Sequence, residues 1–114
     1  MMKLEAVVGA LKCQVIYRGG NFDSKDIRNV VASDLMSDVL VVDKDHLLLV
    51  TSLPSDQTIR TSDIVGAHAV LVVNNKTLPA SMVALAQEMD VTLMQSALSK
   101  FDACVKIGKL MNPP

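Results

Sequence analysis

The positions of apolar residues in the first part of the chain predict short helices and strands. Apolar side chains at i, i+3, i+4 and i+7 predict an amphipathic helix over residues 4–11. Residues 13–17 favour a short strand, and Gly19 and Gly20 end it because glycine adopts turn conformations that other residues resist. Residues 21–29 are polar and without periodicity, so no element is predicted there.

The next segment predicts a strand that leads directly into a helix. Residues 30–32 form a short apolar run, and residues 35–40 have the spacing of a short amphipathic helix. Ser33 and Asp34 lie between the two. Either side chain can cap the helix, because both accept hydrogen bonds from free backbone N–H groups.

Three continuous apolar runs in the second half of the chain are typical of strands buried on both faces. They cover residues 46–51, 69–73 and 91–94. Residues 57–65 favour a short helix, and a longer helix is expected over residues 79–89, where proline is well suited to the first turn. With one more helix at the end, strands and helices alternate, which predicts a mainly parallel sheet covered by helices on both faces.

The last helix is expected to begin after Ser96, whose hydroxyl can cap it, and to end at the Asn-Pro-Pro of residues 112–114. Its predicted buried face holds a set of residues at helical spacing: Leu98, Phe101, Val105 and Gly108, the last for close packing. The predicted fold is therefore α/β: a three-layer α/β/α sandwich with a mainly parallel sheet of about five strands, in a single domain over residues 1–114.

Composition excludes several classes of function. The chain has 11 Lys and Arg against 12 Asp and Glu, and aromatic residues are only 3% of it. Nucleic-acid binders usually combine a basic face with stacking aromatics, so neither nucleic acid nor a membrane surface is an expected partner. No signal peptide and no stretch of about 18 apolar residues is present, so a cytoplasmic location is expected. Cys13 and Cys104 are then expected to be reduced and buried.

The sequence contains no pattern that indicates catalysis or a bound cofactor. Phosphate-binding glycine motifs are absent, and no helix follows the Gly19-Gly20 pair, which is interpreted as a turn. The histidines and cysteines lack metal-ligand spacing. Serine, histidine and aspartate occur, but no nucleophile elbow indicates a triad. We therefore expect a protein that is not an enzyme and holds neither a metal nor a cofactor.

Polar residues gather where the predicted strands end, and ligands of open parallel sheets bind outside the carboxyl ends of the strands. Capping, a solvated helix face and ordinary polar turns are the alternative explanation of the same residues. Their amides and carboxylates can hydrogen-bond a base or a ribose, and the lysine can contact a phosphate. The candidate ligand-binding residues are Ser33, Asp34, Ser37, Asp38, Thr51, Asp56, Gln57, Asn74, Asn75 and Lys76.

Three segments of the chain, residues 31–40, 49–51 and 70–79, resemble the DRTGG domain family. The sequence SDLMSDVL within the first segment is especially similar to the small stand-alone members. The resemblance covers nearly the whole chain and is clearest over residues 30–107. The Asp-Arg position of the family motif corresponds to the loop at residues 55–57, which has no arginine, and the Thr-Gly-Gly position corresponds to Val-Asn-Asn at residues 73–75.

The family occurs alone, between regulatory CBS modules in some inorganic pyrophosphatases, and in phosphotransacetylases, and is similar to the N-terminal domain of HPr kinase/phosphorylase. The resemblance implies an α/β/α sandwich, self-association and a regulatory, ligand-sensing role. We therefore expect a homodimer that senses a nucleotide through the carboxyl-end loops. The alternative is an accessory or protein-interaction subunit of a redox enzyme, because stand-alone members often accompany iron-only hydrogenase components.

Overall fold

The structure, a computed structural model, describes residues 1–113 of the chain. Within this range it contains seven strands: β1 Met2–Lys3, β2 Gln14–Tyr17, β3 Asp26–Ile27, β4 Asn29–Ala32, β5 Leu47–Thr51, β6 Ala69–Val72 and β7 Thr92–Gln95. It also contains five helices: α1 Leu4–Leu11, α2 Met36–Val39, α3 Asp56–Val65, α4 Ala80–Met89 and α5 Lys100–Met111.

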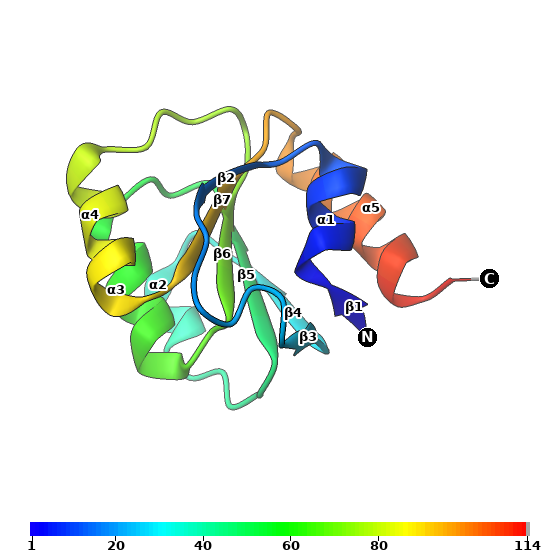
Figure 1. Cartoon of the computed structure of the whole chain (residues 1–114), viewed down its shortest axis with the longest axis horizontal. Helices are drawn as coiled ribbons and strands as arrows, with labels where there is room; N and C mark the ends of the chain where they lie inside the picture. The colour runs from blue at the N-terminus through cyan, green and yellow to red at the C-terminus, as the bar shows by residue number, and fades with distance from the viewer. Residues whose placement is uncertain (114) are drawn as a thin grey trace.

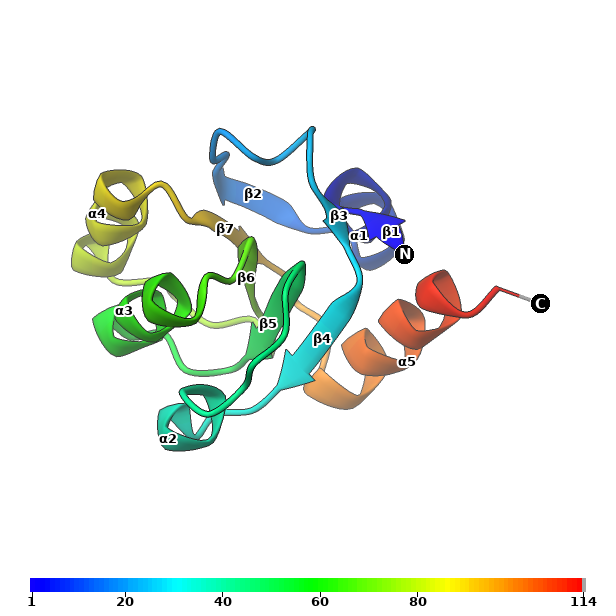
Figure 2. The same ribbon diagram turned by 90° about the horizontal axis from the view of Figure 1, so that it is seen from below.

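The main sheet has five strands in the order β2-β7-β6-β5-β4, as Figure 2 shows. The four strands from β7 to β4 are mutually parallel, and β2 pairs with β7 in the antiparallel direction. The predicted sheet is thereby confirmed. Because β2 runs against its neighbour, its first residue, Gln14, lies opposite Gln95, the last residue of β7. The start of β2 therefore shares an edge of the sheet with the ends of the parallel strands.

Helices cover both faces of this sheet, which gives the three predicted layers (Figure 1). Side chains alternate between the faces: Leu48 and Val50 of β5 pack beneath α1 and α5, whereas Leu49 between them packs against α2, α3 and α4. All five residues of β5 are buried. This double burial explains why the central strands read as continuous apolar runs in the sequence.

Gly19 and Gly20 form a turn whose backbone N–H groups are hydrogen-bonded to side chains at the start of β7 and just before it. The N–H of Gly19 donates to Oγ1 of Thr92 at 3.0 Å, and that of Gly20 donates to Oδ1 of Asp90 at 3.1 Å. A Cβ at Gly19 would lie 2.8 Å from Oγ1 of Thr92, so a larger residue would displace the turn. The glycine pair thus joins the end of β2 to the residues that lead into β7.

Residues 21–29, for which no element was predicted, contain a strand. Asp26–Ile27 (β3) pairs with Met2–Lys3 (β1) in a small antiparallel sheet. Strands of two residues are too short to show an alternating pattern, so the sequence carries no signal for them. Phe22 and Ile27 from this segment are buried in the core beneath α1 and α5.

Two predicted helix caps were wrong. The single turn α2 begins after Leu35, and no side chain caps it: Ser33 accepts a hydrogen bond from the N–H of Leu35, and Asp34 points to other partners. The last helix is capped by Ser99, which accepts from the N–H of Asp102 at 3.1 Å, and not by Ser96. In both cases the predicted cap lies in the loop before the helix.

The predicted buried face of the last helix was also wrong. Phe101 and Val105 are exposed on α5, while Ala103 and Ile107 are buried. Both pairs have the i, i+4 spacing, so periodicity alone does not separate them. No atom outside its own helix backbone lies within 4 Å of where a Cβ of Gly108 would be, so this glycine does not mediate close packing within the described chain.

Both cysteines are free thiols and half-buried instead of fully buried. Desolvation raises the pKa of the Cys13 thiol to about 11, which keeps it protonated and weakly nucleophilic. None of the helices in residues 1–113 has the length and apolar character needed to cross a membrane.

Candidate functional site

The ends of β4, β5, β6 and β7 and the start of β2 meet at one edge of the main sheet, which we call the carboxyl edge. It has two halves. The closed half comprises the ends of β4 and β5 with the first turn of α5. The open half comprises the ends of β6 and β7 with the start of β2. The predicted ligand-binding residues distribute unequally between these halves.

Asp34 is the centre of the closed half. Its Oδ1 accepts from Oγ1 of Thr51 at 3.0 Å and from the N–H of Ser52 at 2.7 Å. Its Oδ2 accepts from the hydroxyl of Ser52 at 2.8 Å and from the ammonium of Lys100 at 2.5 Å. This network joins the end of β4, the end of β5 and the start of α5.

The electrostatics of the closed half favour an ionised Asp34. Partial desolvation acts against ionisation, but the hydrogen bonds from Lys100, Ser52 and Thr51 outweigh it. They hold the pKa of this carboxyl well below its ordinary value. Thr51 is fully buried, and its hydroxyl also accepts from the N–H of Leu53. The polar groups here are satisfied by one another.

Four more predicted residues lie on helices. Ser37 and Asp38 are exposed on α2. Asp56 begins α3 and accepts from the hydroxyl of Ser81 on α4 at 2.9 Å, which joins the two helices. The backbone N–H of Gln57 donates to Ser55, the N-cap of α3, and its side chain is exposed.

The Asn74-Asn75 turn follows β6 and borders both halves of the edge. Both residues have positive φ, 67° and 53°, a conformation that asparagine tolerates better than most residues. Oδ1 of Asn74 accepts from the N–H of Lys100 at 3.2 Å and so helps to cap α5. Asn75 lines the open half. Lys76 is exposed, and its carbonyl accepts from the side-chain amide of Gln95.

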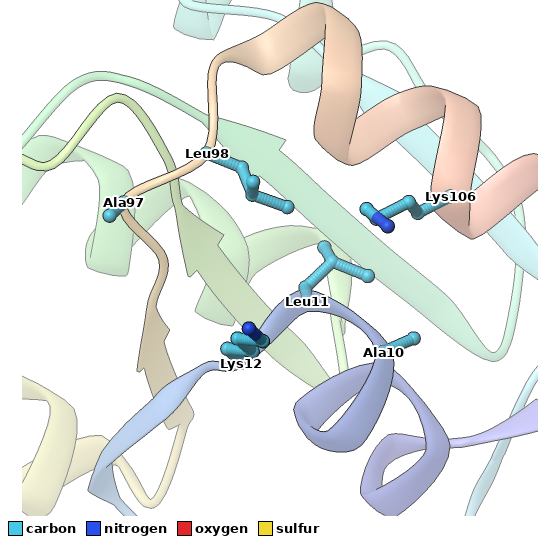
Figure 3. A pocket seen from close by; sticks show the side chains of 6 residues that line it. All are labelled: Ala10, Leu11, Lys12, Ala97, Leu98 and Lys106. Atoms are coloured by element: carbon cyan, nitrogen blue, oxygen red, sulfur yellow. The ribbon is translucent and has the colours of Figure 1, made fainter.

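The open half contains two adjoining hollows, of about 290 and 310 Å³. The first, which we call the apolar hollow, is lined by Ala10, Leu11, Lys12, Ala97, Leu98 and Lys106. Figure 3 shows the side chains of Leu11, Leu98 and Lys106 converging on it. The second, the amide hollow, is lined by Lys12, Gln14, Asn75, Gln95 and Ala97. The two hollows share Lys12 and Ala97, so they form one continuous surface.

Two cations on this surface have no counter-ion. Lys12 and Lys106 form no salt bridge within residues 1–113, whereas Lys100 in the closed half is paired with Asp34. Lys12 has a φ of 51° at the C-cap of α1, the position where glycine is most common. The open half therefore presents ammonium groups, amides and apolar side chains together. That combination suits a small anionic ligand with an apolar part.

Of the ten residues predicted to bind a ligand, the structure places Asn75 in a hollow and joins Asp34 to Thr51 in the closed half. The sequence reasoning did not select the other residues of the open half, above all Lys12, Gln14 and Lys106. The expected ligand-binding residues lie near the ends of parallel strands, whereas Lys12 and Gln14 lie before and at the start of the antiparallel strand β2. The signal for them is the antiparallel direction of β2, which follows from pairing between residues about 80 positions apart.

No protein-family model matches the chain. No curated protein matches it either. Among solved structures, it is similar to the CBS and DRTGG domains of the regulatory region of Clostridium perfringens pyrophosphatase, complexed with its activator diadenosine tetraphosphate. The TM-score is 0.72 at 14% sequence identity, over 93% of this chain. This chain therefore shares its fold with part of that one. This chain spans 46% of the length of that one.

Proposed function

We propose that this chain is a regulatory, ligand-sensing module that binds a nucleotide in the open half of the carboxyl edge. The observation that carries the proposal is the pair of lysines without counter-ions, Lys12 and Lys106, beside an apolar hollow. Phosphates pair with ammonium groups, and a base needs an apolar wall together with hydrogen-bonding groups. The open half offers all three.

A bound nucleotide would place its parts as follows. The base would lie in the apolar hollow against Ala10, Ala97 and Leu98, and the phosphates would contact Lys12 and Lys106. The amides of the second hollow would hydrogen-bond the ribose or the base edge: Gln14, Asn75 and Gln95. Because each hollow has about the volume of the smallest common ligand sites, a mononucleotide would occupy both.

The structural neighbour supports a regulatory role for this fold, since the pyrophosphatase region carries a nucleotide activator. The DRTGG-like segments of the sequence point the same way. We propose accordingly that residues 1–114 are a single DRTGG-like domain that acts in the cytoplasm as a homodimer, without catalysing a reaction. The predicted ligand residues Asn75 and Lys76 remain part of this proposal.

Thermal unfolding with and without nucleotides tests the proposal. AMP, ADP, ATP, GTP and diadenosine tetraphosphate are the probes. A ligand at one hundred times its Kd stabilises the folded state by about 2.7 kcal/mol, which raises the melting temperature by roughly ten degrees. The proposal fails when none of these nucleotides shifts the melting temperature at millimolar concentration.

Matched charge removals locate the site. Lys12→Gln and Lys106→Gln are expected to reduce the nucleotide-induced shift strongly. Lys44→Gln removes the same charge before β5, at the opposite edge of the sheet, and should leave the shift unchanged. Equal shifts of the melting temperature in all three variants would show that the chain binds nucleotide at a place other than the open half.

An accessory subunit of a redox enzyme is the second candidate function. It is favoured by exposed apolar side chains near two helices that pack together, α2 and α3. Leu40 and Val41 come directly after α2, and Ile64 is on α3. Co-purification of the protein from its native cell tests this function. Recovery with a redox enzyme would support it, and recovery as an isolated homodimer would overturn it.

A further inference from the structure

The exposed face of α5 is unusual because it carries a large aromatic side chain in line with other apolar residues. Phe101 is 75% exposed and Val105 is 39% exposed. Together with the half-buried Cys104 and with Gly108, they form a band along one side of the helix, which we call the α5 stripe. Single exposed apolar residues are common, but a continuous band points to a protein contact.

The α5 stripe lies beside an open edge of the sheet. β4 is the end strand of the main sheet, so one side of it has no strand partner among residues 1–113. Figure 2 shows α5 running next to β4. Val30 of β4 is only half-buried beneath the α1–α5 layer, and Ala32 is exposed. The free edge of β4 and the exposed face of α5 are therefore two neighbouring uncovered features of the described chain.

The order of residues on the α5 stripe matches a second copy of itself. Phe101 and Gly108 are seven residues apart, about two helical turns, on the same side of α5. When two copies of α5 lie antiparallel with the twofold axis level with residues 104 and 105, Phe101 of each copy faces Gly108 of the other. No atom beyond the helix's own backbone lies within 4 Å of a Cβ built on Gly108, so this position has room for an aromatic ring.

Charges beside the stripe obey the same symmetry. Asp102 and Lys109 are also seven residues apart and lie on the same flank of the helix. Neither forms a salt bridge within the described chain. The antiparallel arrangement that sets Phe101 against Gly108 brings Asp102 of each copy near Lys109 of the other. One axis therefore satisfies both the shape and the charge.

We propose that the α5 stripe, with the adjacent edge of β4, is the surface through which two copies of this chain associate. The proposal rests on the self-association included in the proposed function and is independent of nucleotide binding. The two pairs across the axis, Phe101 with Gly108 and Asp102 with Lys109, give the interface its register. Hot spots of this kind combine a buried aromatic residue with flanking charge pairs.

Sedimentation of the full chain, from micromolar to near-millimolar concentration, tests the proposal. The natural sequence is expected to be a dimer. Phe101→Asp should weaken the dimer by about tenfold or more, because it buries a charge in place of a ring. Gly108→Leu should weaken it similarly by filling the space opposite Phe101. Gly9→Leu is the matched control, since Gly9 of α1 is equally open and lies on a different helix.

Charge reversal provides a test that only a second copy can satisfy. Asp102→Lys and Lys109→Asp should each weaken self-association, because each sets like charges opposite one another. An equimolar mixture of the two variants should form heterodimers, since both pairs are then complementary. Melting curves of each variant, recorded in parallel, confirm that the chains are folded.

Four outcomes contradict the proposal in distinguishable ways. A monomeric natural chain over the whole concentration range overturns both self-association and this surface, while nucleotide binding is judged separately by thermal shift. A dimer unaffected by Phe101→Asp and Gly108→Leu overturns the surface alone. Failure of the charge-reversed pair to associate overturns the antiparallel register, and binding of α5 to a different protein overturns the second copy as its occupant.

Discussion

The two halves of the carboxyl edge are built from similar residue types but differ in what those residues contact. In the closed half, Asp34 accepts four hydrogen bonds and Lys100 is its ion-pair partner. In the open half, Lys12 and Lys106 have no ion-pair partner in the described chain, and two hollows separate the surrounding elements. Polar residues of the carboxyl edge thus divide into a group that bonds to itself and a group that has no ion-pair partner within the described chain.

The difference in hydrogen bonding follows from which elements meet in each half. The parallel strands β4 and β5 are adjacent, so the residues after them lie within hydrogen-bonding distance of one another. The open half brings α1, the start of β2 and the loop after β7 together from distant parts of the sequence. Its elements meet around apolar side chains such as Leu11 and Leu98. The buried hydroxyl of Ser96 beneath them joins the backbone of these two residues.

The largest expected effect is the loss of Asp34. Asp34→Ala removes four hydrogen bonds, one of them to an ammonium group, and leaves Lys100 unpaired. We expect a loss of about 2–3 kcal/mol in the free energy of unfolding, seen as a melting temperature lower by roughly ten degrees. Urea unfolding measures it. Asp38→Ala, four residues on and exposed, is the control and should cost less than about 0.5 kcal/mol. Equal losses in the two variants would show that the network does not stabilise the fold.

The same carboxylate predicts a pH dependence. The folded-state pKa of Asp34 is lowered from its ordinary value of 3.8, so the folded state favours the ionised form. The contribution of Asp34 to the free energy of unfolding is therefore complete above about pH 4 and is lost as the pH falls below that value. The difference in unfolding free energy between the natural chain and Asp34→Asn should be constant near neutral pH and shrink in acid. A difference that grows in acid would contradict the lowered pKa.

An intermediate effect is expected beneath the open half, at Ser96. This buried hydroxyl donates to the carbonyl of Leu11 at 3.0 Å and accepts from the N–H of Leu98 at 3.2 Å. Ser96→Ala leaves both backbone groups without this partner and should cost about 1–2 kcal/mol. Ser37→Ala, on the exposed side of α2, should cost nothing measurable by the same urea titration. An unchanged Ser96→Ala variant would mean that α1 is held to the loop after β7 by apolar contacts alone.

The sequence predicted the central part of the fold because that part is doubly buried. The strands β5, β6 and β7 are mostly apolar and buried on both faces, and continuous apolar runs of this kind have few alternative explanations. The direction of β2 was not predictable. It depends on the pairing of Gln14 with Gln95, and no local pattern records a partner so distant in the chain.

The candidate site was harder to predict than the fold for the same reason. Asp34 and Thr51 follow adjacent parallel strands, so their proximity could be anticipated from the order of elements. The complete hydrogen bonding of Asp34 could not be anticipated, because one of its partners, Lys100, belongs to the last helix. Lys12 was not predicted because it lies between α1 and β2, and the antiparallel direction of β2 has no local signal in the sequence. On α5, two apolar sets shared one spacing, and the larger side chain of Phe101 favoured the wrong one.

The smallest expected effect has the opposite sign and separates the two halves most sharply. Lys12 occupies a left-handed conformation, with a φ of 51°, at the end of α1. Glycine adopts this conformation at little cost, so Lys12→Gly should raise the free energy of unfolding by about 0.5 kcal/mol. If the open half binds nucleotides, the same variant should lose most of the ligand-induced thermal shift.

Asp90→Gly is the matched control for this gain in stability. Asp90 ends α4 with a φ of 54°, the same left-handed conformation, but its carboxylate accepts hydrogen bonds from Tyr17 and Gly20. Replacing it should therefore lower stability despite the relief of the backbone. Lys12 has a conformation that favours glycine, and its side chain forms no hydrogen bond or ion pair within the described residues. A lysine at this position is explained when its ammonium group binds a ligand. The opposite result would be a Lys12→Gly variant that is less stable and that binds nucleotide with the affinity of the natural chain. It would show that Lys12 stabilises the fold, as Lys100 does, and that the two halves do not differ in this respect.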